Sequence, residues 1–126
     1  MIFVIKALVV DDEKLIRECL ARTLRTEDVE VKTAASGEIA VELAKAESFD
    51  IVFLDMVMPG IDGGKTYAAL KKIQNNARYV IVSGSPIGSF LETAKKDGIP
   101  IIRKPFDTDE IMAEVERLRQ VKTAGI

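Results

Sequence analysis

The chain has 126 residues, of which 48% are hydrophobic and 30% charged, a composition typical of one globular domain rather than of a disordered chain. Its 18 basic and 20 acidic residues give a formal net charge of −2, which disfavours non-specific binding to nucleic acid or to an anionic membrane surface. One cysteine and no histidine exclude an intramolecular disulfide and leave too few ligands for a zinc site. No apolar run reaches the roughly 20 residues that span a bilayer, and the first residues lack the flanks of a signal sequence, so we expect a cytoplasmic protein.

Short apolar segments alternate with longer segments of helical periodicity. The expected strands are Ile2–Val10, Val29–Ala34, Ile51–Leu54, Tyr79–Val82 and Ile99–Ile102. The expected buried helix positions are Leu15, Ile16, Cys19, Leu20 and Leu24, then Ile39, Leu43 and Ala46, then Tyr67, Leu70 and Ile73, and last Ile111, Met112, Val115, Leu118 and Val121. A weaker helix is expected over Gly88–Lys96, which completes five strand–helix pairs.

Residues that start or stop helices fall between these segments. Ser36 and Asp62 are typical N-cap residues, an acidic first turn follows Asp107, and Gly98 ends a helix that carries lysines in its last turn. Repeated strand–helix units with right-handed crossovers predict a mainly parallel sheet covered by helices on both faces. The sequence therefore predicts a single α/β domain.

Unusual polar residues lie where the expected strands end. Asp11 and Asp12 follow the first strand, Asp55 the third, Ser83 the fourth and Lys104 the fifth. In open α/β sheets, sites form at this edge, at the point where the helices change faces. If the strand order is 2-1-3-4-5, that point lies between the first and third strands, which carry the three aspartates.

Three carboxylates at one edge would repel one another unless a cation compensates them. Because all the candidate ligands are hard oxygens, the set favours Mg²⁺ or Mn²⁺ over zinc. Mg²⁺ is usually held by one or two carboxylates with waters and a phosphate group. One aspartate is then free to act as a nucleophile in phosphoryl transfer, and the lysine and the serine hydroxyl could hold the phosphoryl oxygens.

Four motifs resemble the response-regulator receiver domain of two-component signalling. They are Val10-Asp11-Asp12-Glu13, the segment 54–63 (LDMVMPGIDG), Val82-Ser83-Gly84 and Arg103-Lys104-Pro105-Phe106, and their order and spacing match across essentially the whole chain. The resemblance implies a flavodoxin-like, doubly wound, five-stranded parallel sheet of order 2-1-3-4-5 with five helices. We expect residues 1–126 to be a single receiver domain without an output domain, either a stand-alone receiver or one excised from a longer protein.

The resemblance assigns roles to the residues at the strand ends. Asp55 would accept a phosphoryl group from a phosphohistidine of a sensor kinase, and Mg²⁺ would be held by Asp12, Asp55 and the backbone carbonyl of Val57, with Asp11 acting directly or through water. Lys104 would pair with Asp55 at rest and with the phosphoryl group afterwards.

Further roles concern the switch itself. Ser83 would be the hydroxyl drawn towards the phosphoryl oxygens, and the bond between Lys104 and Pro105 resembles the family's cis peptide bond. This sequence departs from the family at Ile101, where an aromatic residue often turns inward, so the usual hydroxyl–aromatic coupling is not expected. Val57 and Ser85 are not suited to orienting an attacking water, so we expect slow loss of the phosphoryl group.

The function implied is a signalling switch that catalyses only its own phosphorylation and dephosphorylation. Its partners would be a sensor histidine kinase or phosphotransfer protein and a downstream protein, which would bind the surface of the fourth helix, fifth strand and fifth helix. We expect a monomer or weak dimer with no direct contact with nucleic acid.

Other interpretations remain open at this point. The chain could be a phosphorylation-independent adaptor, or a Mg²⁺-dependent aspartyl-phosphate phosphatase, although no residues are left for a cap domain. A flavodoxin-like nucleotide carrier would need a Ser/Thr/Gly phosphate loop where Asp11-Asp12-Glu13 stands. Asp11 and Asp12 could simply cap the first helix, Ser83 could be an ordinary turn hydroxyl, and Cys19 is expected to be a small core residue.

Overall fold

Strands and helices alternate along the whole described chain, which in this computed structural model comprises residues 4–26 and 28–124. The elements are β1 (Ile5–Val10), α1 (Lys14–Leu24), β2 (Val29–Ala34), α2 (Gly37–Ala46), β3 (Ile51–Leu54), α3 (Gly63–Ile73), β4 (Arg78–Ser83), α4 (Phe90–Asp97), β5 (Ile101–Arg103) and α5 (Thr108–Ala124). None of the helices in this part of the chain is long and apolar enough to cross a bilayer.

The five strands form one parallel sheet in the order β2-β1-β3-β4-β5, which confirms the predicted architecture and strand order. The register aligns the strand ends: Val10, the last residue of β1, lies opposite Ala34 of β2 and Leu54 of β3. The carboxyl ends of β1 and β3 therefore meet side by side at the edge where the aspartates follow.

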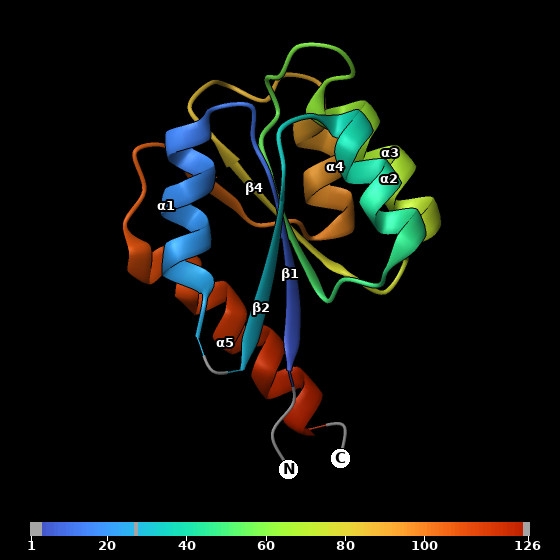
Figure 1. Cartoon of the computed structure of the whole chain (residues 1–126). Coiled ribbons are helices and arrows are strands. Elements are labelled where there is room, and N and C mark those ends of the chain that lie inside the picture. Colours follow the sequence, from blue (N-terminus) through green and yellow to red (C-terminus); the bar gives the residue numbers. More distant parts are fainter. Residues whose placement is uncertain (1–3, 27, 125–126) are drawn as a thin grey trace.

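Helices cover both faces of the sheet (Figure 1). Alternate strand residues point to opposite faces, so each face has its own apolar core. One core joins the sheet to α1 and α5 through residues such as Leu20 and Ile111, and the other joins it to α2, α3 and α4 through residues such as Leu70 and Phe90. Because both faces are covered at the centre of the sheet, β1, β3 and most of β4 are apolar runs. The edge strand β2 instead alternates apolar and polar residues, several of them exposed.

Most boundary residues are where the sequence places them. The side chain of Ser36 accepts a hydrogen bond from the backbone N–H of Ile39, and that of Asp62 accepts one from Lys65. Gly98 ends α4 in the left-handed conformation with a φ of 68°, which glycine adopts without steric cost. The expected first strand starts later, at Ile5, and the expected residues 2 and 3 lie outside the described part of the chain.

The predicted buried face of α1 is partly wrong. Leu20 and Leu24 are buried, but Leu15 is 79% exposed and Cys19 is also exposed, so Cys19 is not a core residue. Leu15 and Leu24 are nine positions apart and, at 3.6 residues per turn, project from opposite sides of the helix. The sheet is contacted only by the side that carries Leu20, Ala21 and Leu24.

The predicted face of α2 is also partly wrong: Leu43 packs against the core, but the fully buried residues of this helix are small ones. Ile39 is 47% exposed, whereas Gly37, Ala40 and Ala44 are buried. A Cβ at Gly37 would lie 2.1 Å from the Thr66 hydroxyl oxygen of α3, so the lack of a side chain lets the two helices approach closely. Ile73 and Val121, expected in the core, are likewise exposed by 39% and 66%.

An aromatic cluster joins α3, β4 and α4. The Tyr67 ring of α3 packs edge-on against Tyr79 of β4 and Phe90 of α4, with ring centroids 5.0 and 5.3 Å away. The Tyr67 hydroxyl also donates a hydrogen bond to the carboxylate of Asp97, the last residue of α4. Tyr67 thus contacts both ends of α4.

The first turn of α3 packs directly on the chain that leaves β3. The N–H of Gly63 donates to the carbonyl of Met56 at 2.9 Å, and a Cβ at Gly63 would lie 2.4 Å from the carbonyl oxygen of Asp55. These neighbours are backbone atoms, which cannot move aside without displacing Asp55. Gly63 therefore helps to fix the backbone at Asp55.

We expect Gly63→Ala to lower the free energy of unfolding by about 1–3 kcal/mol, the usual cost of overpacking a closely packed site. The matched control is Gly64→Ala, because the nearest atom to a Cβ there is the Asp62 side-chain oxygen at 3.4 Å, an ordinary contact. That variant should be neutral or stabilising, by at most about 1 kcal/mol, since alanine is the better helix former. Urea unfolding of both variants measures this difference, and equal stabilities would contradict it.

Candidate functional site

The candidate site residues are held by backbone hydrogen bonds that extend the sheet beyond its strands. The N–H of Asp11 donates to the Ala34 carbonyl at 3.1 Å, and the N–H of Asp55 donates to the Val10 carbonyl at 2.9 Å. The N–H of Lys104 donates to the Ser83 carbonyl at 3.0 Å. Each side chain therefore begins from a rigid backbone position at the carboxyl edge of the sheet.

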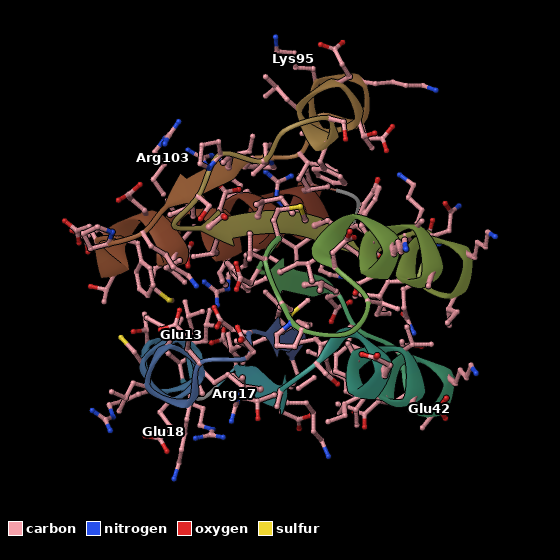
Figure 2. All side chains as sticks on the ribbon, turned by 90° about the horizontal axis from the view of Figure 1, so that it is seen from above. Glu13, Arg17, Glu18, Glu42, Lys95 and Arg103 are labelled. Carbon is pink, nitrogen blue, oxygen red and sulfur yellow. The ribbon has the colours of Figure 1, made fainter. Side chains whose placement is uncertain are left out.

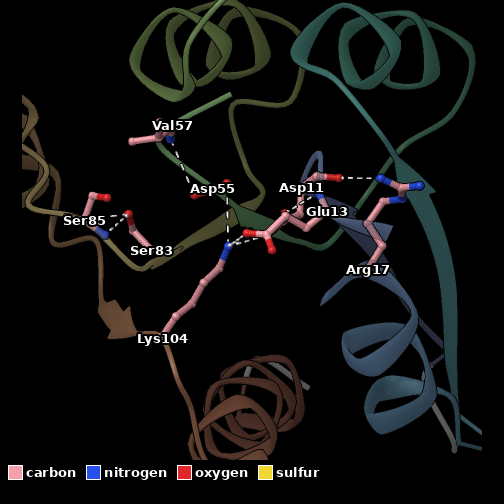
Figure 3. A network of polar contacts seen from close by, with 8 residues as sticks. All are labelled: Asp11, Glu13, Arg17, Asp55, Val57, Ser83, Ser85 and Lys104. Carbon is pink, nitrogen blue, oxygen red and sulfur yellow. Dashed lines mark hydrogen bonds and ion pairs between the residues drawn. The ribbon is translucent and has the colours of Figure 1, made fainter. Parts of the chain in front are cut away.

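The three predicted aspartates come together at this edge, and Figure 3 shows two of them, Asp11 and Asp55, on either side of the Lys104 ammonium group. Asp11, Asp12 and Asp55 each offer one carboxylate oxygen, and these oxygens lie within 4.8 Å of one another. Asp11 and Asp55 are buried, with 1% and 5% of their surface exposed, while Asp12 is exposed. Two buried carboxylates and one exposed carboxylate form a site that is open to solvent on one side. Such a site suits a hard cation, such as Mg²⁺, that keeps some of its bound waters.

Lys104 lies between the two buried carboxylates. Its Nζ is 2.7 Å from Asp11 Oδ2 and 3.6 Å from Asp55 Oδ2, so the expected pairing with Asp55 is present but the shorter contact is to Asp11. The side chain of Lys104 is only 12% exposed. A desolvated cation at this distance compensates two charges that would otherwise repel each other at close range.

The surroundings shift the acidity of Asp55 and Lys104. Burial, and next the neighbouring Asp11 charge, raise the pKa of Asp55 above its usual value, although Lys104 and the Val57 N–H act in the opposite direction. Burial alone would lower the pKa of Lys104, but the hydrogen bond to Asp11 and the nearby carboxylates raise it overall. Lys104 is therefore charged at neutral pH. Ionised Asp55 is less stable in this site than an ionised aspartate in water, because the carboxylate is buried beside Asp11.

Ser83, the last residue of β4, is buried but is not bonded to the aspartates. Its Oγ donates to the Ser85 carbonyl at 3.2 Å and accepts from the Ser85 N–H at 3.3 Å. These bonds stay within the loop after β4, as Figure 3 shows. The interpretation of Ser83 as a turn hydroxyl thus describes its present contacts, and a role at the site requires the side chain to rotate.

The backbone beside the site has the predicted special features. The peptide bond between Lys104 and Pro105 is cis, as the motif implies. Val57 is 60% exposed, and its N–H lies 3.4 Å from Asp55 Oδ1. Met56 and Met58, which flank Val57, are buried in the core on the α2, α3 and α4 side of the sheet.

Two residues at the site were not predicted from the sequence. Glu13 donates its N–H to Asp11 Oδ1 at 2.9 Å, and its carboxylate lies 3.7 Å from Lys104 Nζ. The Nη1 of Arg17 donates to the Asp11 carbonyl at 2.9 Å. Glu13 is also the N-cap of α1 and makes no side-chain capping bond, so neither Asp11 nor Asp12 serves as that N-cap.

Comparison with known proteins agrees with this geometry. The family model of the response regulator receiver domain matches residues 7–116. Sporulation initiation phosphotransferase F of Bacillus subtilis is 33% identical over 119 residues, which are 94% of this chain and 96% of that protein. A response regulator receiver protein of Anaeromyxobacter is 31% identical over 83% of this chain, but the match covers only 44% of that protein, so this chain spans less than half its length.

Solved structures show the same fold. A CheY-like receiver domain protein of Methanospirillum hungatei superposes with a TM-score of 0.87 at 20% identity, over 96% of this chain and 98% of that one. A response regulator of Burkholderia pseudomallei, solved with a phosphorylated aspartic acid, a calcium ion and citrate, has a TM-score of 0.79 at 27% identity, over 96% of this chain and 72% of that one.

The family match covers most of the chain, and the strand order and the acidic edge are those that the sequence motifs imply. The chain belongs to the response regulator receiver domain family of two-component signalling.

Proposed function

We propose that Asp55 accepts a phosphoryl group from a phosphohistidine of a sensor histidine kinase or phosphotransfer protein, in a reaction that requires Mg²⁺. One observation carries the proposal: the Asp55 carboxylate is buried beside two further carboxylates and one buried lysine at the carboxyl edge of the sheet. A relative solved with a phosphorylated aspartic acid supports the same chemistry.

The cation site consists of oxygen ligands alone. Asp11, Asp12, Asp55 and the backbone carbonyl of Val57 would hold Mg²⁺, and the clustered carboxylate oxygens fit it. When bound, Mg²⁺ would neutralise charge on the carboxylates and on the phosphoryl oxygens.

The protein's own residues orient and stabilise the transferred group. A carboxylate oxygen of Asp55 forms the new bond to phosphorus as the bond from phosphorus to the histidine nitrogen breaks. Lys104, already held 3.6 Å from Asp55, pairs with a phosphoryl oxygen once Asp55 carries the new group. Ser83 leaves Ser85 and donates its hydroxyl to another of those oxygens.

The downstream partner binds the surface formed by α4, β5 and α5. Leu91 of α4 and Ile101 of β5 are large apolar residues that are 40% and 39% exposed there. A phosphoryl group adds negative charge and strong hydrogen-bond acceptors at the site. These acceptors favour the conformation in which the Ser83 hydroxyl faces Asp55. The change in Ser83 in turn shifts the conformation of the loop after β4 and of α4. In this proposal residues 1–126 act as one cytoplasmic receiver domain, a monomer or weak dimer, without an enzymatic role beyond its own phosphorylation.

A phosphorylation-independent adaptor is the second candidate. The observation that favours it is Ile101, which has no ring that could turn inward and lies exposed on β5. The Ser83 hydroxyl is also engaged with Ser85 and not with the site. In the adaptor, the acidic site would persist without being phosphorylated.

We expect one added phosphoryl group, seen by intact mass, when the protein is incubated with acetyl phosphate and Mg²⁺. The adduct should be absent without Mg²⁺ and absent in Asp55→Asn. Asp62→Asn is the matched control, because Asp62 is an exposed cap at the start of α3 and its asparagine can still cap, so that variant should be modified like the wild type. Mg²⁺ binding without an adduct, also with a purified histidine kinase as donor, would support the adaptor.

Asp55→Asn should stabilise the protein at neutral pH in the absence of divalent cations. A carboxyl group whose pKa is raised on folding binds its proton more tightly in the folded state, so stability falls as the pH rises from the unfolded value of about 3.8 through the folded value. We expect a gain in the free energy of unfolding at pH 7, and this gain should shrink as the pH approaches 4. Urea unfolding with a chelator present measures it, and Glu30→Gln on the exposed side of β2 should show no such gain.

The phosphoryl group should be lost slowly, over minutes or longer. The side chains next to the site are those of Val57, which is apolar, and Ser85, and neither offers an acid or amide to hold an attacking water. Val57→Asn should shorten the lifetime, because its amide can hydrogen-bond such a water. Mass measured at intervals after removal of the donor follows the decay, and a half-life of seconds in the wild type would contradict this expectation.

A further inference from the structure

A groove of about 550 Å³ runs between α1 and the edge strand β2. Its polar lining consists of Lys14, Arg17, Glu18 and Arg22 of α1, Arg25 directly after this helix, and Thr33 of β2. Figure 3 shows Arg17 on the side of α1 that faces β2. One end of the groove therefore begins at the phosphorylation site, where Arg17 donates to the Asp11 carbonyl at 2.9 Å.

The groove has an excess of positive charge, although the chain as a whole carries a net charge of −2. Four cations face a single carboxylate, and that carboxylate, Glu18, is only 3.9 Å from Lys14. Arg22 and Arg25 make no ion pair or side-chain hydrogen bond with any residue in the described part of the chain. By contrast, Arg78 is paired with Glu114 at 2.8 Å. Two arginines are thus left available for external carboxylates.

These cations are spread along the length of α1. Lys14 and Arg25, the residue after the helix, are eleven positions apart, which corresponds to about 16 Å at helical rise, and Arg22 and Arg25 are three positions apart and so lie on neighbouring sides of the chain. An extended segment of about five residues has the same length. An extended acidic peptide is therefore long enough to reach from one end of the groove to Arg22 and Arg25 at the other.

The strand beside the groove has an open edge. β2 pairs only with β1 within the described sheet. The carbonyls of Asp28 and Ala34 accept hydrogen bonds from the N–H groups of Ile5 and Asp11, on the β1 side. Because the backbone groups of successive strand residues point to alternate sides, the N–H and carbonyl groups of Val31 and Thr33 point to the open side. Such an edge can pair with a further extended segment.

We propose that the groove between α1 and β2 docks an acidic, extended segment of a partner protein, which places carboxylates on Arg22 and Arg25 and pairs its backbone with β2. A second copy of this chain fits less well, because two such grooves facing each other would place positively charged arginines close to the same arginines of the other copy. The proposal does not depend on phosphorylation of Asp55.

The test uses a fluorescein-labelled alternating glutamate–threonine peptide of about eight residues, titrated against the full chain at low ionic strength with anisotropy as the readout. We expect saturable binding that weakens about tenfold or more in Arg22→Gln/Arg25→Gln. The matched control is Lys95→Gln/Lys96→Gln, which removes the same charge from the end of α4, on the far side of the molecule from α1 (Figure 2). That control and Asp55→Asn should bind within about twofold of the wild type. Arg22→Lys/Arg25→Lys should bind more tightly than Arg22→Gln/Arg25→Gln, because it keeps the two positive charges.

Two ligand controls test the binding mode without altering the protein. The same peptide N-methylated at alternate residues cannot donate to the strand edge and should bind about tenfold more weakly. An oligothymidylate of equal charge should also bind more weakly, because it cannot pair as a strand.

The proposal is overturned if the wild type shows no saturable binding or if both double glutamine variants lose it equally. It is also overturned if the N-methylated peptide or the oligothymidylate binds as tightly as the peptide. A dimer in sedimentation that dissociates in Arg22→Gln/Arg25→Gln would assign the groove to self-association instead. Circular dichroism confirms that each variant is folded.

Discussion

Two buried carboxylates, those of Asp11 and Asp55, share one ammonium group, and the parallel sheet brings all three together. Each begins at a backbone position fixed by a hydrogen bond that continues the sheet, so none of the side chains can relax far from the others. Without Lys104 both charges would be buried close together and uncompensated, which proteins avoid. The lysine therefore makes a dense acidic site compatible with a folded protein. It also leaves that site short of positive charge, because this one ammonium group lies beside the three clustered carboxylates of Asp11, Asp12 and Asp55. This residual imbalance is what a divalent cation can relieve.

Much of this arrangement could be predicted from the sequence, because it depends on order along the chain. In a parallel sheet every strand ends at the same edge, so a polar residue directly after an apolar run is placed once the strand order is known. Asp55 and Lys104 are 49 positions apart in the sequence, yet both follow this rule. The N-caps Ser36 and Asp62 were predictable for a similar reason, since a cap depends on its own side chain and on the backbone within three residues.

Features that depend on three-dimensional packing were not predictable in this way. The buried side of a helix is selected by what it packs against, and both Leu15 and Leu24 are apolar although only Leu24 faces the sheet. Where α2 packs closely against α3, small side chains are buried in place of large ones, so Ala40 is buried and Ile39 is exposed. The exact partner of Lys104 depends on differences of about an ångström, which no pattern encodes. The same holds for Arg17, whose bond to the Asp11 carbonyl requires the first turn of α1 to lie against that loop.

The packing of α4 against α3 has a practical consequence for spectroscopy. The chain has no tryptophan and only two tyrosines, and both belong to the aromatic cluster beside α4. Tyr67 contacts Phe90 at one end of α4 and Asp97 at the other, so any displacement of that helix changes the surroundings of one of the two chromophores. The near-ultraviolet emission and circular dichroism of the unlabelled protein consequently come almost entirely from this one junction. An intrinsic optical probe thus lies beside α4, and its signal reports how α3, β4 and α4 pack against one another.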